Sequence, residues 1–266
     1  MPFVDCYARL SSAFPGLRVH QGPPRSGGGW TPSTALAEDA GALDALIALE
    51  AADGERLYGT PLRPDVAASF ALHRYAWPAC LLMSVPWFLD RRVPRLPPER
   101  VSVNRSEHRM TVEIREFSCL PGDPAARLPG ARVVPDEEAL RGALRAAVAE
   151  HLEPLLAAFR PRMRRGPRAL WGMATDELIE SLWYLGHLFN EEDRAAAALA
   201  ALLPGRTPPF VGNADLQPAP TPSGAYPQHA RTRLSCCLYY TLRPEEVCAT
   251  CPRSCESQRS ERLVAS

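Results

Sequence analysis

The feature that most constrains this chain is a concentration of cysteines near its C-terminal end. Five of its eight cysteines fall within residues 236–255, in the pattern C-C-x10-C-x2-C followed by one more: Cys236, Cys237, Cys248, Cys251 and Cys255. A C-x2-C arm forms a tight turn that lets two sulfurs and nearby backbone N–H groups converge on one metal. The pattern therefore predicts a metal site built by this segment.

The adjacent pair, Cys236 and Cys237, is the unusual part of the pattern. Neighbouring side chains of a strand point to opposite faces, so both sulfurs reach one site only if the backbone bends there. The simplest arrangement assigns one iron to Cys236 and Cys237, and the other to Cys248 and Cys251. Four thiolates are what a [2Fe–2S] cluster requires.

Other readings of the cysteines remain open from spacing alone. A structural zinc site also takes four thiolates, although such sites favour two separated C-x2-C arms. A [4Fe–4S] cluster could use Cys248, Cys251 and Cys255 with one of the adjacent pair. Disulfide bonds between these cysteines are a further alternative, but they form poorly in a reducing compartment. His229 lies near enough in sequence to be a histidine ligand of an iron–sulfur cluster. We expect Cys255 to be an additional free thiol.

The rest of the chain has the composition and periodicity of a globular α+β protein. Of its 266 residues, 46% are apolar and 23% are charged, near the globular norm. Apolar residues recur at helical spacing in five stretches: 35–57, 65–89, 137–159, 169–190 and 191–203. Alternating patterns at 100–104 and 110–117 predict an antiparallel hairpin, and 131–134 predicts an edge strand. The predicted fold is mainly helical, with a small antiparallel sheet and a short cysteine-rich module.

Changes in composition predict the domain boundaries. Residues 1–203 form the α+β main domain, and the proline-rich stretch 204–230 reads as a connector lying on it. The cysteine module spans 231–256, and the polar residues 257–266 form a tail.

Charge and residue usage exclude several functions. Basic and acidic residues balance at 30 each, which predicts no nucleic-acid partner. The chain contains no lysine, which excludes a Schiff-base lysine and a phosphate-loop lysine. Its most apolar stretch, 75–89, is shorter than the roughly 20 residues of a membrane span and holds two prolines. We expect a cytoplasmic protein without stable membrane insertion.

The string RLSCCLYYTLRPEEVCATCP, residues 233–252, resembles the C-terminal iron–sulfur segment of the FhuF family of ferric-siderophore reductases. That family carries two adjacent cysteines, an aromatic position soon after them, and a C-x2-C arm ten residues later. All four of its cysteines match, as Cys236, Cys237, Cys248 and Cys251. The string RALWG at 168–172 also resembles part of the family's larger domain.

This resemblance implies a [2Fe–2S] cluster on those four cysteines. It also implies an enzyme, an oxidoreductase that reduces Fe(III) bound to a hydroxamate-type siderophore by one electron and releases Fe(II) in the cytoplasm. No G-x-G-x-x-G follows a predicted strand, so the electron is expected from an external donor, such as a ferredoxin-like or flavin-reductase system.

Two arginines next to the cysteines, Arg231 and Arg233, are candidate contacts for the siderophore. The same residues also fit a solvated basic strand that leads to the cysteines. Two other functions compete with the reductase: an iron–sulfur sensor or regulator, and a zinc-stapled binding domain without enzymatic activity. A sensor needs a DNA- or protein-binding element, and the sequence shows neither a helix-turn-helix pattern nor a basic tail.

Overall fold

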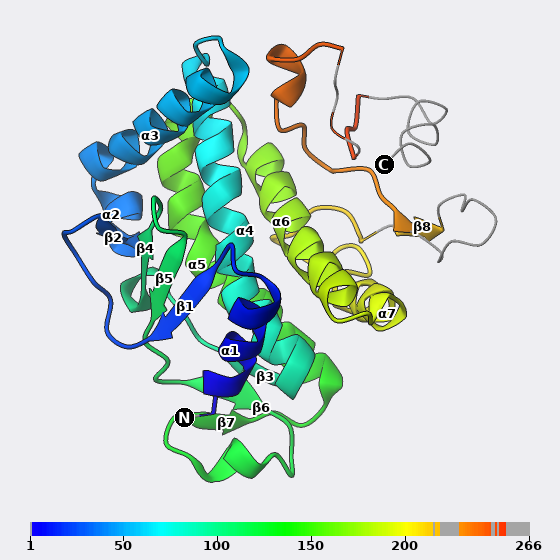
Figure 1. Ribbon diagram of the computed structural model, residues 1–266. Coiled ribbons are helices and arrows are strands. Elements are labelled where there is room, and N and C mark those ends of the chain that lie inside the picture. The colour runs from blue at the N-terminus through cyan, green and yellow to red at the C-terminus, as the bar shows by residue number, and fades with distance from the viewer. Residues whose placement is uncertain (1, 215, 219–228, 246–247, 249, 254–266) are drawn as a thin grey trace.

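The computed structural model describes residues 2–214, 216–218, 229–245, 248 and 250–253. Helices dominate this part of the chain (Figure 1). The α-helices are α1 (Val4–Ala13), α2 (Ser33–Glu38), α3 (Ala40–Tyr58), α4 (Pro64–Asp90), α5 (Glu137–Met163), α6 (Pro167–Leu188) and α7 (Glu192–Leu202). Short 3-10 helices are η1 (Pro98–Arg100), η2 (Pro124–Arg127) and η3 (Tyr239–Thr241).

Within the described residues, short strands form three small sheets. The strands are β1 (Arg18–Gln21), β2 (Trp30–Pro32), β3 (Arg92–Pro94), β4 (Val101–Asn104), β5 (Arg109–Val112), β6 (Phe117–Cys119), β7 (Ala131–Val133), β8 (Gln217–Pro218) and β9 (His229–Ala230). The first sheet has the order β1-β5-β4-β2, the second β3-β6-β7, and β8 pairs with β9. Within them, β1 runs parallel to β5 and β6 parallel to β7, and the other pairs are antiparallel.

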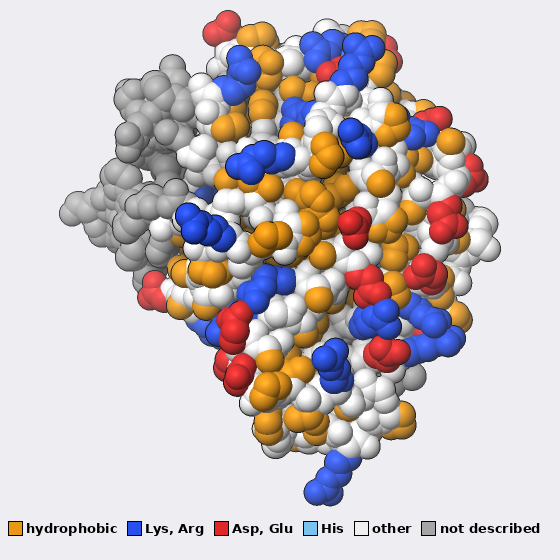
Figure 2. Space-filling view, turned by 180° about the vertical axis from the view of Figure 1, so that it is seen from behind, with side chains coloured by type: hydrophobic (Ala, Val, Ile, Leu, Met, Phe, Trp, Pro, Cys, Tyr) orange, Lys and Arg blue, Asp and Glu red, His pale blue; other side chains and the backbone are white. Residues whose placement is uncertain are grey.

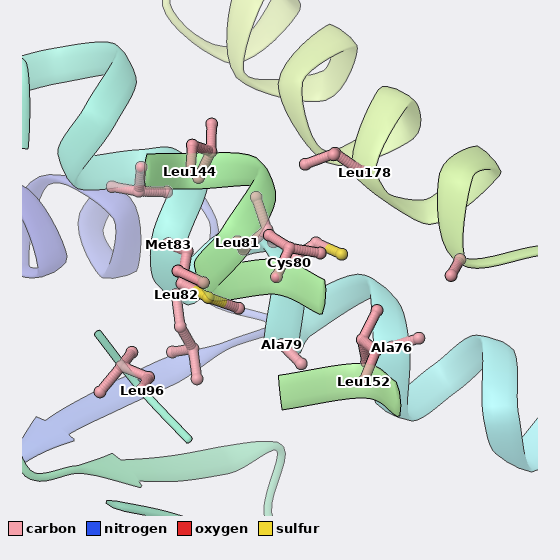
Figure 3. Close-up of a cluster of buried hydrophobic side chains, with 14 of the residues drawn as sticks. Ala76, Ala79, Cys80, Leu81, Leu82, Met83, Leu96, Leu144, Leu152 and Leu178 are labelled. Atoms are coloured by element: carbon pink, nitrogen blue, oxygen red, sulfur yellow. The ribbon is translucent and has the colours of Figure 1, made fainter. Parts of the chain in front are cut away.

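Helix α4 is the centre of the molecule. It is buried along nearly its whole length and packs against α1, α3, α5 and α6 (Figure 1). Figure 3 shows its middle, where Leu81, Leu82 and Met83 lie among side chains from α5 and α6, including Leu144 and Leu178. A helix that is apolar on all sides must be surrounded by other elements to leave water, which explains this central position.

Local signals define where the surrounding helices begin and end. The Asp136 side chain accepts a hydrogen bond from the Ala139 N–H at 2.8 Å, which caps the start of α5. Asp39 caps α3 in the same way through Gly41, and Gly59 ends that helix in the left-handed conformation that glycine adopts freely. Helix α6 starts with Pro167 in its first turn, where proline has no backbone N–H to lose.

The predicted fold class is confirmed: a mainly helical domain carries small sheets. The antiparallel hairpin exists as β4 and β5, and the predicted edge strand exists as β7. The two larger sheets are mixed rather than purely antiparallel, because β1 and β7 each add a parallel partner. Such pairings join segments far apart in sequence, so no local alternation signals them.

Several element boundaries differ from the sequence-based expectation. The stretch 35–57 is two helices, α2 and α3, separated at Asp39, whose side chain caps the second helix. The stretch 110–117 divides between β5 and β6, which belong to different sheets. Helix α1 and strands β1 and β2 lie outside the stretches predicted as helix or strand, and α5 continues to Met163, beyond its predicted end at residue 159.

The surface that Figure 2 shows carries basic and acidic side chains interspersed, with apolar side chains between them. None of the helices in the described ranges combines the length and the apolar run that crossing a membrane requires.

Candidate metal centre

The four predicted ligands lie in one short stretch that folds back on itself after β9 (Figure 1). The Cys251 N–H donates to the Cys248 carbonyl at 3.0 Å, so the C-x2-C arm forms the expected tight turn. Cys251 is buried, whereas Cys236, Cys237 and Cys248 are half-buried. Cys255 lies outside the described residues, as does the side chain of His229.

The backbone bends directly after the adjacent cysteines, as their convergence on one site requires. Leu238 has a φ of 71°, a left-handed conformation that is uncommon for residues other than glycine. Its N–H donates to the Cys236 sulfur at 3.4 Å. The Cys237 and Cys248 sulfurs lie 3.9 Å apart, which joins the adjacent pair to the C-x2-C arm.

In the described residues, the possible metal ligands are only partly gathered around one point. Among them, no group of three or more histidine, cysteine or acidic side chains is gathered tightly enough to enclose a metal ion. The sulfur pair in contact consists of Cys237 and Cys248, one from each arm. The assignment of Cys236 and Cys237 to one iron and of Cys248 and Cys251 to the other stays a prediction.

The thiols differ in acidity because their neighbours differ. The pKa of Cys237 falls to about 5, first because the Cys248 thiol donates a hydrogen bond to it. The Tyr239 backbone N–H and the positive charge of Arg233 add to this effect. Cys248 shows the opposite shift, since it donates that bond and is partly buried, so its pKa rises. A thiolate at Cys237 is the form that binds a metal.

The segment that bears the cysteines is fastened to α6 by buried charges. Asp176, on α6, accepts from the Arg231 guanidinium and from the backbone N–H groups of Leu234 and Ser235, both at 2.9 Å. Burial raises the pKa of Asp176, and the two arginines, Arg231 first, oppose that rise. A buried carboxylate with this many donors holds the chain in one position.

A second buried carboxylate connects the segment to α4. Glu177 accepts from Arg233 at 2.5 Å and lies 2.6 Å from the His73 ring nitrogen Nδ1. One turn earlier on α4, the Ser69 hydroxyl donates to the Cys237 carbonyl at 3.1 Å. The cysteines are therefore held against both α4 and α6.

Close packing at α6 completes the attachment. The Ser235 hydroxyl donates to the Ala169 carbonyl at 2.8 Å, and a Cβ added to Gly172 would lie 2.5 Å from that hydroxyl oxygen. Gly172 thus permits a close approach that any larger residue would prevent. The Tyr239 ring meets Tyr58 edge to face, with centroids 5.8 Å apart.

The two candidate siderophore contacts, Arg231 and Arg233, belong to the buried ion pairs that attach the cysteine segment to α6. The side chains of Arg231 and Arg233 are only 4% and 9% exposed, and both are paired with acids of α6. They are therefore neither a solvated strand nor an open surface in this state. A direct contact of either arginine with a siderophore stays a prediction.

Sequence reasoning missed four residues that hold the cysteine segment in place: Ser69, His73, Asp176 and Glu177. A usable signal existed for two of them, because Asp176 and Glu177 lie side by side in a helical stretch rich in apolar residues. Acidic residues are rarely buried unless they are paired, so such a pair predicts cationic partners. Ser69 and His73 carry no comparable signal.

Comparison with known proteins bears on the cysteine segment alone. Residues 233–253 match the family model described as the FhuF 2Fe-2S C-terminal domain. No curated protein sequence matches the chain. The residues present fit the cofactor that this domain implies, because four thiols lie in one segment and the two arms already meet sulfur to sulfur. The C-terminal segment of this chain thus matches the FhuF 2Fe-2S C-terminal domain, which implies a [2Fe–2S] cluster as its cofactor.

Proposed function

We propose that this protein is a ferric-siderophore reductase, which transfers one electron to Fe(III) in a hydroxamate-type siderophore and releases Fe(II) in the cytoplasm. The match of residues 233–253 to the FhuF 2Fe-2S C-terminal domain carries this proposal. Cys236, Cys237, Cys248 and Cys251 would hold the cofactor, which supplies a one-electron carrier of tunable potential.

The chemistry of the substrate makes a single electron sufficient. Hard, anionic oxygen ligands bind Fe(III) far more tightly than Fe(II), because the higher charge attracts them more strongly. Adding one electron to the metal therefore loosens the complex without breaking a covalent bond of the siderophore. The electron enters from an external one-electron donor, of the ferredoxin-like or flavin-reductase kind.

The residues of the chain contribute position and environment. The ion pairs of Arg231 and Arg233 with α6 hold the cysteine segment against the main domain. Burial of Cys251 limits access of water, and the positive charge of Arg233 lies near Cys237. Positive charge and hydrogen bonds near cluster sulfurs favour the reduced form, so this environment raises the tendency to accept an electron.

Anaerobically purified full-length protein tests the proposal. We expect two irons per chain, broad visible absorption, and a rhombic EPR signal at low temperature after dithionite reduction. Mixing the reduced protein with a ferric tris-hydroxamate should restore the visible colour, with one Fe(II) trapped by a ferrous chelator for each chain reoxidised. A reduced cluster that no ferric chelate reoxidises would refute the reductase function, and a colourless zinc protein would refute the cofactor as well.

The Cys248→Ser variant provides the matched comparison, with Cys119→Ala as its control. Cys119 is buried in β6, away from the cysteine segment, so its removal should leave iron content unchanged. Cys248→Ser should lose most of the visible absorption and all Fe(II) release, because a serine oxygen replaces one thiolate.

A further inference from the structure

A cavity of about 550 Å³ opens between α3, α4, the β4–β5 hairpin and the loop that follows α1. Figure 1 shows these elements grouped on the side of α4 that faces away from α7. The cavity lies entirely in the main domain, and none of the four cysteines lines it. Its size is in the range of small-molecule sites.

The cavity lies close to the cysteine segment through one face of α4. His73 lines the cavity, and Ser69, which binds the Cys237 carbonyl, is four residues earlier on the same helix. Residues four apart in a helix lie one above the other, about 6 Å apart along the axis. The His73 ring also contacts Glu177 at 2.6 Å, and Glu177 binds Arg233. The wall of the cavity is thus one side chain away from the residues that hold the cysteine segment.

The polar lining is weakly cationic. Four arginines line the cavity: Arg56, Arg74, Arg105 and Arg109. Three carboxylates pair with them: Glu50, Asp53 and Glu107. The arginines outnumber these carboxylates by one, and the guanidinium N–H groups that the pairs leave over can donate to oxygen atoms. The lining suits a ligand with many surface oxygens and at most about one negative charge.

The remaining lining is largely apolar and includes two aromatic side chains. Trp77 and Phe14 meet edge to face with centroids 5.7 Å apart, and both line the cavity. The indole N–H of Trp77 has no hydrogen-bond partner among the described residues. Aromatic walls with a few polar groups are typical of small-molecule sites, and here they suit the alkyl chains that link hydroxamate groups.

We infer that this arginine-lined cavity is the docking site of the ferric chelate, which it takes as an oxygen-rich complex that is neutral or singly charged. The inference rests on the proposed reductase function and adds the location of the acceptor. It places the iron beside the face of α4 that carries Ser69 and His73, about one helical turn from the contact of Ser69 with the cysteine segment. His73, Glu177 and Arg233 then form the contact between the two sites.

A blocking variant with a matched control tests the location. Leu57 and Leu49 both lie on α3 and are both 55% exposed, but only Leu57 lines the cavity. Leu57→Trp should fill part of the cavity at little cost in stability, and Leu49→Trp adds the same bulk outside it. The probe is the gallium(III) complex of a linear tris-hydroxamate, which has the shape of the ferric complex but accepts no electron.

Binding is measured by calorimetry on the cluster-loaded protein. We expect Leu57→Trp to weaken binding of the gallium complex by about tenfold or more, which is 1.4 kcal/mol, and Leu49→Trp to leave it unchanged. Iron content and the EPR signal should be the same in all three proteins. The gallium tris-catecholate, with three negative charges, should bind more weakly than the tris-hydroxamate, because the single excess positive charge of the lining compensates only part of the charge that the complex takes out of water.

The outcomes separate this inference from the proposed function. If Leu57→Trp binds and reduces the chelate like the unchanged protein, the cavity is not the docking site, although the reductase function stands. If the unchanged protein binds no gallium complex and reduces no ferric chelate, both are wrong. Tighter binding of the trianionic catecholate than of the hydroxamate would overturn the assigned ligand class.

Discussion

Asp176 shows how a single buried residue can hold a cofactor-bearing segment in place. It is completely buried, yet it receives one guanidinium and two backbone N–H donors from the cysteine segment. Removing one partner of such a pair leaves the other charge buried without compensation, which costs more than the pair itself stabilises. The attachment of the segment therefore depends on Asp176 more than on any exposed ion pair.

The Asp176→Asn variant tests this dependence. It keeps the size of the side chain but leaves Arg231 with Glu180 as its remaining acid, at 3.8 Å. We expect a loss of about 3–5 kcal/mol in unfolding free energy, together with lower iron content after purification. Chemical denaturation and iron analysis measure both.

Glu138→Gln is the control for this variant. Glu138 also pairs with two arginines, Arg141 and Arg145, but its side chain is 61% exposed. Water screens such pairs, so its loss should change the unfolding free energy by less than about 1 kcal/mol and should leave iron content unchanged. Equal effects of the two variants would contradict the special role of the buried carboxylate.

At the scale of elements, the contact between α6 and the cysteine segment depends on a missing side chain. Gly172 lies in the interior of α6, where glycine lowers helix stability relative to alanine by about 1 kcal/mol. The close approach of Ser235 explains its presence. Glycine at this position therefore lowers the stability of the helix but permits the contact with the cysteine segment.

Gly172→Ala should separate these two effects. The methyl group displaces Ser235 and breaks its bond to Ala169, so amide hydrogen exchange should increase in residues 231–245. The main domain should keep its thermal stability, because α6 gains helix propensity.

Gly142→Ala is the matched control on α5, where the added Cβ meets only the end of the Arg145 side chain, at 3.7 Å. We expect a stability gain of up to about 1 kcal/mol and no change in exchange of the cysteine segment. If Gly172→Ala also leaves that exchange unchanged, the close packing does not hold the segment.

At the scale of the whole molecule, a buried histidine makes stability depend on pH. His151 is completely buried on α5, where one ring nitrogen lies 2.7 Å from the Leu96 carbonyl and the other 2.9 Å from the Tyr75 hydroxyl. Burial lowers the pKa of His151 from 6.5 to about 4. The folded protein therefore keeps this ring neutral at pH values where the unfolded chain protonates it.

This shift determines the sign of the pH effect. Between about pH 6.5 and pH 4 the unfolded chain binds one proton more than the folded protein at this residue, so acidification favours unfolding. The contribution is fully present above pH 6.5 and falls by roughly 3 kcal/mol by pH 4. Denaturation curves at several pH values should show this slope, and His151→Gln should flatten it. An unchanged slope in the variant would assign the pH dependence to other groups.

The amino-acid sequence by itself predicted the longer helices, one hairpin and the position of the cofactor site. Helical periodicity predicted the regions of α4 to α7, alternation predicted the β4–β5 hairpin, and the cysteine spacing predicted a metal site. The resemblance of residues 233–252 to the FhuF segment then assigned this site to a [2Fe–2S] cluster. These signals are local: a helix face, a strand face and a chelating turn each repeat within a few residues.

Only the tertiary structure decided how these parts meet. The parallel pairing of β1 with β5, the burial of Arg231 and Arg233 against α6, and the contact of His73 with Glu177 join residues far apart in the chain. An arginine next to a cysteine looks the same in sequence whether it faces water or a buried carboxylate. The difference arises from packing of α4 and α6, because only the assembled core places Asp176 and Glu177 where a charge needs a partner.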